Sequence, residues 1–430
     1  MLGPDETTPL NYRAPDHWTI LKQSIQEYLA SKLNLHLIVL SCFLLCYGFF
    51  LLSYSLTLYL TEELDLSDSA AGIIYAVTGL MLVIYSLVFG VLPDRYGYPV
   101  CLLACGLVLC GGFLTLGLFK SLWVTLTNLF VLVPLGAGIA LPSIKVGVKY
   151  LATRETTAVS YSVLTIFIYT AGAFAGLTIE LARDYTSNSF QVEFFVASGL
   201  GLGLSVIGAV LMKTEELSQT QEKSYFSSIK EVGSEKKFWR YFGLVLVLVV
   251  VKSVFRHLDA TLPKYMTREI GENAMFGMVL AIHSVALVVF IVVFVSYSFF
   301  YEYYSVMVVG SVVVGISPLA LLFEASYLTC IVFAVGVALG ESLWAPRLLD
   351  YTLDVAPQSK EGVYMSLATL PLFLAMVVSG LMSGVLLEEF CPKEGTRDCG
   401  YMWAIIAGCA MTGALLLLVL RKTLEEKILK

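Results

Sequence analysis

Charged side chains are scarce in this chain of 430 residues: they make up 14% of it, against about 25% in an average soluble protein. Hydrophobic residues make up 58%. They gather in runs of about twenty residues or more, the length that crosses roughly 30 Å of hydrocarbon as a helix. The composition therefore excludes a soluble globular protein and indicates a polytopic membrane protein.

Several functional signatures are also missing. No G-x-x-x-x-G-K-[ST] loop occurs, so the sequence does not predict direct use of ATP. No long basic tract indicates nucleic acid as a partner, and the net charge of −6 says little about partners. The few polar residues within the apolar runs form no nucleophile–base or metal-ligand grouping. The sequence therefore predicts neither an enzyme nor a site for a metal or cofactor.

The apolar runs predict an all-α membrane protein with twelve transmembrane helices. A secretory signal would place a short apolar core closer to the start of the chain than Leu35, so we interpret the first run as an uncleaved span. The predicted spans cover residues 35–60, 70–92, 100–119, 122–142, 157–179, 190–212, 239–263, 274–298, 305–322, 326–349, 362–387 and 401–420.

A polar linker over residues 213–238 separates six spans from six. A polar tail, 1–34, precedes the first six-helix half, 35–212, and the second half with a short tail fills 239–430. Within the N-terminal tail, apolar residues recur at helical spacing from Trp18 onward. This pattern predicts either an amphipathic helix on the membrane surface or an extension of the first span.

The basic residues predict the orientation in the membrane. Of the 27 Lys and Arg residues, 19 lie on the side of both termini and the linker, six lie on the other side, and Lys252 and Arg256 lie within a span. Basic residues favour the cytoplasmic side, so both termini are expected there. Cys391 and Cys399 then lie in an extracellular or lumenal loop, where they either form a disulfide or remain a free pair. We expect a plasma membrane or an endolysosomal-type membrane.

The loop after the second span reads GVLPDRYGYP, residues 90–99. It resembles the signature G-x-L-A-D-R-x-G-R of the major facilitator superfamily, which lies between spans two and three. The matching residues are Gly90, Leu92, Asp94, Arg95 and Gly97, and the departures are Pro93 and Tyr98. Together with the six-plus-six layout, the resemblance covers the whole chain. It implies two six-helix halves and a conformational latch made by Gly90, Asp94, Arg95 and Gly97.

The tenth span and its exit read GESLWAPRLLDYTLDVAP, residues 340–357. This segment resembles, more distantly, the proton-coupled oligopeptide transporters. The matching residues are Glu341, Asp350, Tyr351, Ala356 and Pro357, with Gly136, Gly138 and Pro142 in span four. Leu141 stands where that family has Lys, and the first span lacks the E-x-x-E-R motif that serves proton coupling and substrate binding in the family.

Span seven carries Lys252, Arg256 and Asp259 at spacings of four and three, so they share one helical face, and His257 lies beside it. An ionisable side chain within a span costs about 3 kcal/mol and therefore faces a cavity or a partner. In the superfamily, spans seven and ten both line the central cavity, which brings Glu341 into the same region. The alternative is a structural ion-pair network that fixes contacts between helices.

The depth of each charged residue in the membrane predicts which residues form ion pairs. At a rise of 1.5 Å per residue, Lys252 lies about 16 Å and Arg256 about 10 Å from the outer end of span seven, and Glu341 about 22 Å from the outer start of span ten. Lys252 is the better match for Glu341, and Arg256 is expected to meet Asp259 or a substrate anion. The predicted substrate and proton site comprises Lys252, Arg256, His257, Glu341 and Trp344.

Two other groups of intramembrane polar residues receive structural interpretations. His283 stands alone in span eight and is expected to be a packing residue. Glu180, Arg183 and Asp184 lie near the end of span five, where extension toward water is expected.

The sequence predicts a secondary transporter that moves a small polar or charged organic solute by alternating access. The solute classes are peptides, amino acids and organic anions, and proton coupling is expected. The expected partners are this small molecule, protons and the lipid bilayer, with the protein a monomer. The alternatives are a facilitative uniporter and a non-transporting receptor or scaffold on the same fold.

Overall fold

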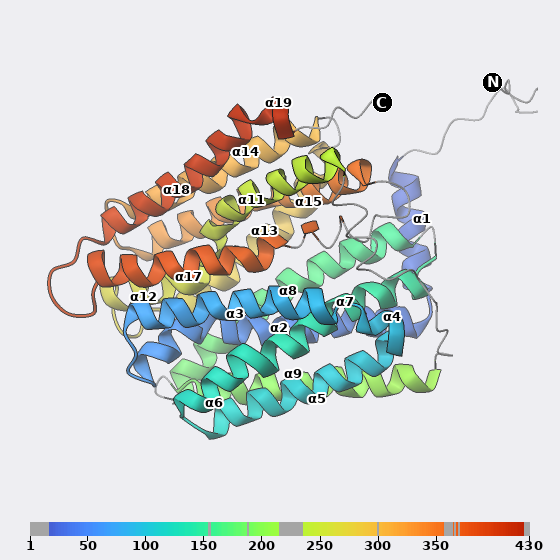
Figure 1. The fold of residues 1–430 in the computed structure, drawn as a ribbon, viewed down its shortest axis with the longest axis horizontal. Coiled ribbons are helices and arrows are strands. Elements are labelled where there is room, and N and C mark those ends of the chain that lie inside the picture. Colours follow the sequence, from blue (N-terminus) through green and yellow to red (C-terminus); the bar gives the residue numbers. More distant parts are fainter. Residues whose placement is uncertain are drawn as a thin grey trace, which may run out of the picture.

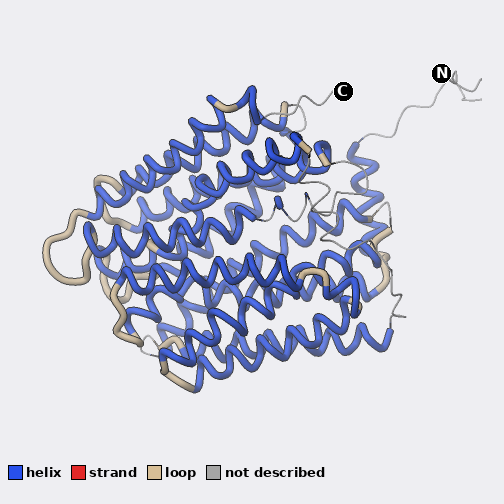
Figure 2. The backbone as a smooth tube through the Cα atoms, in the orientation of Figure 1, coloured by secondary structure: helices blue, strands red, loops and turns tan. Residues whose placement is uncertain are grey.

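The computed structural model describes residues 17–153, 156–186, 189–214, 235–298, 301–356, 364, 367–368 and 370–424. Residues 1–16 of the predicted tail and 215–234 of the predicted linker lie outside the described residues. In the described part of the chain, helices follow one another through short loops and no strand occurs (Figure 2). The predicted all-α class is confirmed.

Among the described residues, twelve helical segments are long and apolar enough to cross a membrane, which agrees with the predicted number. In the first half they are α2 (Leu33–Glu62), α3 (Asp68–Phe89), α5 (Tyr98–Leu118), α6 (Leu122–Thr127) continued by α7 (Val133–Leu151), α8 (Thr157–Thr186) and α9 (Gln191–Thr214). In the second half they are α11 (Lys236–Ala260), α13 (Phe276–Ser298), α14 (Tyr303–Ile316), α15 (Tyr327–Val355), α17 (Leu370–Phe390) and α18 (Cys399–Val419).

Shorter elements complete the architecture. A π-helical turn, Asn128–Leu132, joins α6 to α7, and a 3-10 turn, Ser317–Leu321, follows α14. The short helices are α1 (His17–Leu29), α4 (Leu92–Tyr96), α12 (Leu262–Glu269) and α19 (Arg421–Leu424). The fourth span differs from its prediction, because α7 continues past residue 142 to Leu151. Its last turns carry Lys145 and Lys149, which lowered the apolarity on which the predicted boundary depended.

The two halves lie side by side, with α2 to α9 in the lower part of Figure 1 and α11 to α18 in the upper part. Helices α1 and α19 lie toward one end of the bundle, which we call the termini side. The loop between α17 and α18, which holds Cys391 and Cys399, lies at the opposite end, which we call the disulfide side.

The most extensive contacts between the halves are those of α3 with α17 and of α8 with α13. Their backbones touch at glycines. A Cβ atom added to Gly72 of α3 would lie 2.3 Å from the carbonyl oxygen of Gly380 in α17, and one added to Gly176 of α8 would lie 2.3 Å from that of Gly277 in α13. Small residues allow such close helix contacts within a membrane. Any side chain at these glycines must therefore push the halves apart.

We predict that Gly72→Ala opens the disulfide side, because its methyl group would overlap the Gly380 carbonyl. Opening is measured by double electron–electron resonance between spin labels at Trp123→Cys and Phe323→Cys, called the label pair below. Both positions are exposed, one in each half, and the seven free cysteines are first replaced. A longer label distance is expected. The matched control is Gly111→Ala, since a Cβ atom there meets open space; equal distances in both variants would contradict the prediction.

Candidate functional site

The centre of the bundle holds an ion pair between Lys252 of α11 and Glu341 of α15. Their side chains are 6% and 2% exposed. The Lys252 ammonium lies 3.7 Å from the ring centroid of Phe255 and 5.9 Å from that of Trp344. The structure thus pairs Lys252 with Glu341, as depth predicted, and adds an aromatic wall that includes Trp344.

The first half reaches this pair through a hydroxyl. Tyr169 of α8 donates a hydrogen bond of 3.0 Å to Oε1 of Glu341, the oxygen that also accepts from Lys252. Among the described residues, Oε2 of Glu341 has no hydrogen-bond partner although it is buried. The hydrogen bond between α8 and α15 therefore depends on how strongly the Glu341 carboxylate accepts.

A second buried ion pair lies on the same face of α11. Arg256 donates to Oδ2 of Asp259 at 2.7 Å, and its Nε and Nη2 donate to the Leu372 carbonyl of α17 at 3.2 and 3.1 Å. From the first half, Ser53 and Tyr75 donate to the same Asp259 oxygen at 2.7 and 3.2 Å. Arg256 meets Asp259, one of its two predicted partners, and hydroxyls again connect the halves.

His257 of α11 and His283 of α13 have other contacts. His257 is fully buried, and its Nδ1 lies 2.7 Å from the Thr261 hydroxyl on the next helical turn. The ring of His283 packs 5.3 Å from that of Phe255. For both residues, Nε2 has no hydrogen-bond partner among the described residues. The hydrogen bonds of Lys252, Glu341, Arg256 and Asp259 given above include neither histidine, so a substrate or proton role for His257 stays a prediction.

The latch motif lies on the termini side. Helix α3 ends at Phe89 and is capped by Gly90, and the short helix α4 presents Asp94 and Arg95 to solvent. Gly97 has a φ of 85°, which only glycine adopts readily, and it lets the chain turn directly into α5. The loop therefore has the compact turn that the sequence predicts, and its action as a latch stays a prediction.

We predict that Asp94→Asn slows transport while the protein remains folded and inserted in the membrane. The exposed carboxylate is the only acid of α4, and Asn keeps its shape but removes the charge with which a latch would hold the facing half. Transport in liposomes is the readout, with size-exclusion elution as the measure of folding. Wild-type turnover in the variant would show that the motif does not act as a latch here.

Charged groups hold the halves together on the disulfide side. Asp68 at the start of α3 accepts bonds of 2.8 Å from Lys264 and from Arg268, both on α12. Glu180 of α8 accepts from the backbone N–H of Gly277 at 2.6 Å, at the start of α13. Burial lowers the pKa of Lys264 to about 8, although Asp68 acts in the opposite direction. These contacts close the disulfide side.

Arg183 belongs to the same region, and the prediction that it extends toward water is wrong. The residue is 7% exposed. Its Nη2 donates to the Glu272 carbonyl at 3.1 Å, and its guanidinium lies 5.0 Å from the ring centroid of Phe276. Carbonyl and ring both come from the second half, which turns the side chain inward.

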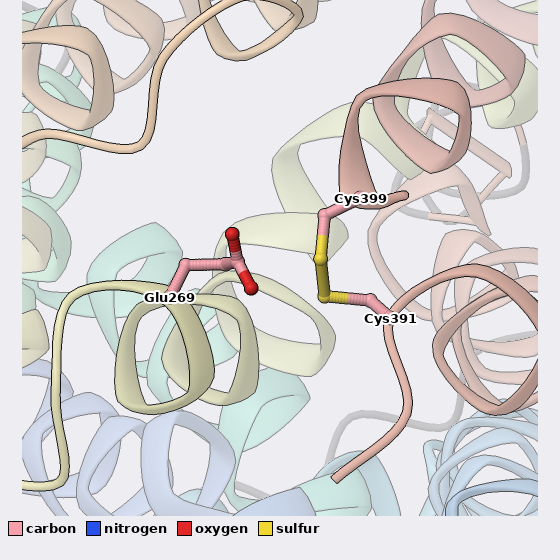
Figure 3. Close-up of side chains that lie close together, drawn as sticks. All are labelled: Glu269, Cys391 and Cys399. Carbon is pink, nitrogen blue, oxygen red and sulfur yellow. A yellow bond between two sulfur atoms is a disulfide. The ribbon is translucent and has the colours of Figure 1, made fainter. Parts of the chain in front are cut away.

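Cys391 and Cys399 form a disulfide, and Glu269 of α12 lies beside it (Figure 3). Their ligand-type atoms lie within 4.8 Å of one another. Both sulfurs are bonded to each other, however, so neither is available as the thiolate that binds metals. Glu269 pairs instead with Arg397 of the loop at 3.4 Å. The arrangement fixes the loop to α12, which carries Lys264 and Arg268.

Residues 38–271, more than half of the chain, match the family model described as Major Facilitator Superfamily. This chain belongs to the Major Facilitator Superfamily. It is therefore a multi-pass membrane transporter and not an enzyme, as the sequence predicted. No curated protein matches it significantly.

Solved structures agree with this superfamily fold. The chain is similar to the POT family transporter PepTSo, with a TM-score of 0.75, 15% identity, and coverage of 91% of this chain and 98% of that one. It is similar to a POT family transporter in complex with 5-aminolevulinic acid, with a TM-score of 0.74, 14% identity, and coverage of 91% and 96%. The chain is also similar to the nucleoside transporter NupG, with a TM-score of 0.70, 13% identity, and coverage of 89% of this chain and 99% of that one. At such identities the likeness is one of fold.

Proposed function

We propose that this superfamily member is a proton-coupled secondary transporter of a small polar or charged organic solute. The supporting observation is the buried Lys252–Glu341 pair, whose acid also accepts a hydrogen bond from Tyr169 of the opposite half. An anion at this depth is costly unless a cation balances it. The charge of Glu341 is therefore linked both to the occupancy of the site and to the contact between the halves.

A proton on Glu341 would change both contacts. The neutral acid no longer attracts the Lys252 ammonium, which becomes available to an anionic group of a substrate. It also accepts more weakly from Tyr169, which loosens the bond between α8 and α15. A substrate amine would replace Lys252 as the partner of Glu341, and Trp344 would form part of the wall around it.

The ligands named for similar structures support a small organic solute. Transporters of the POT family were solved in complex with a thioalcohol-conjugated peptide, with 5-aminolevulinic acid and with alafosfalin. Peptides, amino acids and organic anions are therefore the first compounds to test on this chain. A ligand at one hundred times its Kd stabilises the protein by about 2.7 kcal/mol, which a thermal-shift screen detects.

The decisive experiment is proton flux during uptake of the compound that the screen identifies. The purified protein is reconstituted into liposomes that contain a pH-sensitive dye, and substrate is added outside. Proton entry that requires the substrate supports the proposal. Uptake without proton entry indicates a facilitative uniporter, and binding without uptake indicates a receptor; either result overturns proton-coupled transport.

We also propose that the termini side is cytoplasmic and the disulfide side extracellular or lumenal. Thr396 is exposed in the loop between Cys391 and Cys399. A Thr396→Cys variant that lacks these two cysteines is expected to react in intact cells with a membrane-impermeant thiol reagent, if the protein is in the plasma membrane. In an organelle, the reaction is expected only after the organelle membrane is opened. Labelling after selective opening of the plasma membrane alone would reverse the orientation.

A further inference from the structure

Glu193, near the start of α9, is a buried acid that the proposed transport site does not use. Its exposed fraction is zero, and among the described residues neither carboxylate oxygen has a hydrogen-bond partner. Helix α9 packs against α2 and α5. A buried, unpaired carboxylate is far costlier than a neutral acid. The surroundings of Glu193 therefore favour its protonated, neutral form.

A hydroxyl of α2 lies beside this acid. Ser55 faces Glu193, and its Oγ is buried without a hydrogen-bond partner among the described residues. Ser53, two positions earlier, donates to Asp259 in the other half. Two residues correspond to about 200° around a helix, so Ser53 and Ser55 lie on opposite faces of α2. Helix α2 thus separates Asp259 from Glu193, with a serine directed toward each acid.

Arg183 of α8 supplies the nearby positive charge. The second half holds its Nη2 through the Glu272 carbonyl and packs Phe276 against its guanidinium. Its Nη1 is buried and has no hydrogen-bond partner within the described part of the chain. Arg183 acts electrostatically on Glu193, and Glu180 acts with the opposite sign. The first half therefore contains a cation that the second half currently binds.

Other charged groups near Glu193 are few. On α8 they are Glu180, Arg183 and Asp184. Glu62 ends α2 and Glu63 follows it, and Glu63 pairs with Lys120, which lies just after α5. Helix α5, which covers α9 on another side, carries no charged residue between Tyr98 and Leu118. Arg183 is therefore the cation on these packed helices that is placed to stabilise an ionised Glu193.

We propose that Glu193 is a second proton-binding site, which links proton uptake to closure of the disulfide side. With this side closed, Glu193 carries a proton and Arg183 is bound by the second half. When the halves part, Arg183 loses the Glu272 carbonyl and pairs with Glu193, whose proton passes to water on the disulfide side. The guanidinium stays charged throughout, so one proton leaves for each opening. The proposal rests on the proposed alternating access, but not on the identity of the substrate or on Glu341.

The direction of the pH dependence follows. The closed form binds the Glu193 proton more tightly than the open form, so acid favours closure and alkali favours opening. Glu193→Gln resembles the protonated acid and should weaken the pH dependence of opening. The dependence that remains comes from Lys264, which contacts Asp68 and whose pKa burial lowers to about 8. Arg183→Gln removes the partner of the ionised acid and should weaken the pH dependence of opening in the same way.

Infrared spectroscopy tests whether Glu193 carries a proton. In the reconstituted full chain at about pH 7, well above the ordinary carboxyl pKa of about 4.3, we expect a carbonyl-stretch band of a protonated carboxylic acid. This band should disappear in Glu193→Gln and persist in Glu394→Gln, a control at an exposed acid of the disulfide loop. An identical band in wild type and Glu193→Gln would overturn the proposal.

The label pair at Trp123 and Phe323 tests the coupling. In wild type the label distance should lengthen as pH rises, in Glu193→Gln it should lengthen less, and Glu394→Gln should follow wild type. If Glu193→Gln does not assemble, Arg183→Gln is measured instead: a weaker pH response than that of wild type supports the proposal, and an unchanged response overturns it. Neither measurement needs a substrate. A failure of proton-coupled uptake with an intact Glu193-dependent response would therefore refute the proposed function and leave this inference standing.

Discussion

Glu341→Gln is expected to abolish proton-driven accumulation of substrate while the protein stays folded and inserted in the membrane. Gln keeps the size of the side chain and its hydrogen bond with Tyr169, but it neither attracts Lys252 nor binds a transferable proton. Removing the charge of one partner of a buried ion pair destabilises a protein by about 3–5 kcal/mol. A fall in accumulation of at least about a hundredfold is consistent with that cost, because each 1.4 kcal/mol is a factor of ten.

Two assays on this variant distinguish the roles of the acid. Accumulation is measured in liposomes with an imposed pH gradient, and counterflow exchange is measured without one. If Glu341 carries the coupled proton, counterflow survives; if it binds a substrate amine, both activities are lost. Glu394→Gln, at an exposed acid, is the control. Wild-type values in both assays would assign Glu341 to a structural ion pair only.

The stability of the same pair gives an internal check. Glu341→Gln leaves the Lys252 ammonium buried without its counter-ion, so the melting temperature should fall. Adding Lys252→Met removes the stranded charge and should recover most of the loss, since apolar replacements of buried ion pairs are often neutral.

Asp68→Asn is expected to shift the protein strongly toward an open disulfide side. Asp68 is 9% exposed in its side chain and balances Lys264 and Arg268, whose side chains are 2% and 8% exposed. Without the carboxylate, two buried cations face each other with no anion between them. A loss of about 3 kcal/mol from the closed state corresponds to roughly a hundredfold change in the ratio of open to closed protein.

The label pair at Trp123 and Phe323 measures this shift directly. Asp65→Asn is the matched control in the preceding loop, because Asp65 is exposed and has a φ of 52°, which Asn adopts as readily as Asp. The control should show the wild-type distance. A wild-type distance in Asp68→Asn as well would mean that the glycine contacts of α3 and α17 close this side without help from the charges.

The features predicted correctly depend on signals that are local in sequence. Long apolar runs give the twelve spans, because crossing hydrocarbon demands a fixed length of apolar helix. The i,i+3 spacing places Arg256 beside Asp259, and the helical rise matches the depth of Lys252 to that of Glu341. Each of these arguments needs the geometry of only one or two helices.

The features that escaped prediction depend on how distant helices meet. Nothing in the sequence around Ser53 or Tyr75 shows that both hydroxyls reach Asp259, some two hundred residues away. Arg183 has the usual position of a residue that extends to water, and only the packing of α8 against α13 turns it toward Glu272. The sequence pattern assigns no role to Glu193, because this residue lies at the start of its apolar run. A carboxylate inside a predicted span is nevertheless a usable signal of a functional site.

The distribution of charge between the halves bears on the electrical behaviour of transport. Both central ion pairs lie wholly within the second half, and the first half contacts their acids with hydroxyls from Tyr169, Ser53 and Tyr75. Each pair is neutral, so rocking the halves moves no net central charge through the field of the membrane. About 2.3 kcal/mol accompanies each elementary charge that crosses 100 mV. The electric charge that crosses the membrane in each transport cycle therefore equals the charge of the solute plus that of the protons transported with it. A current recorded during turnover measures this sum.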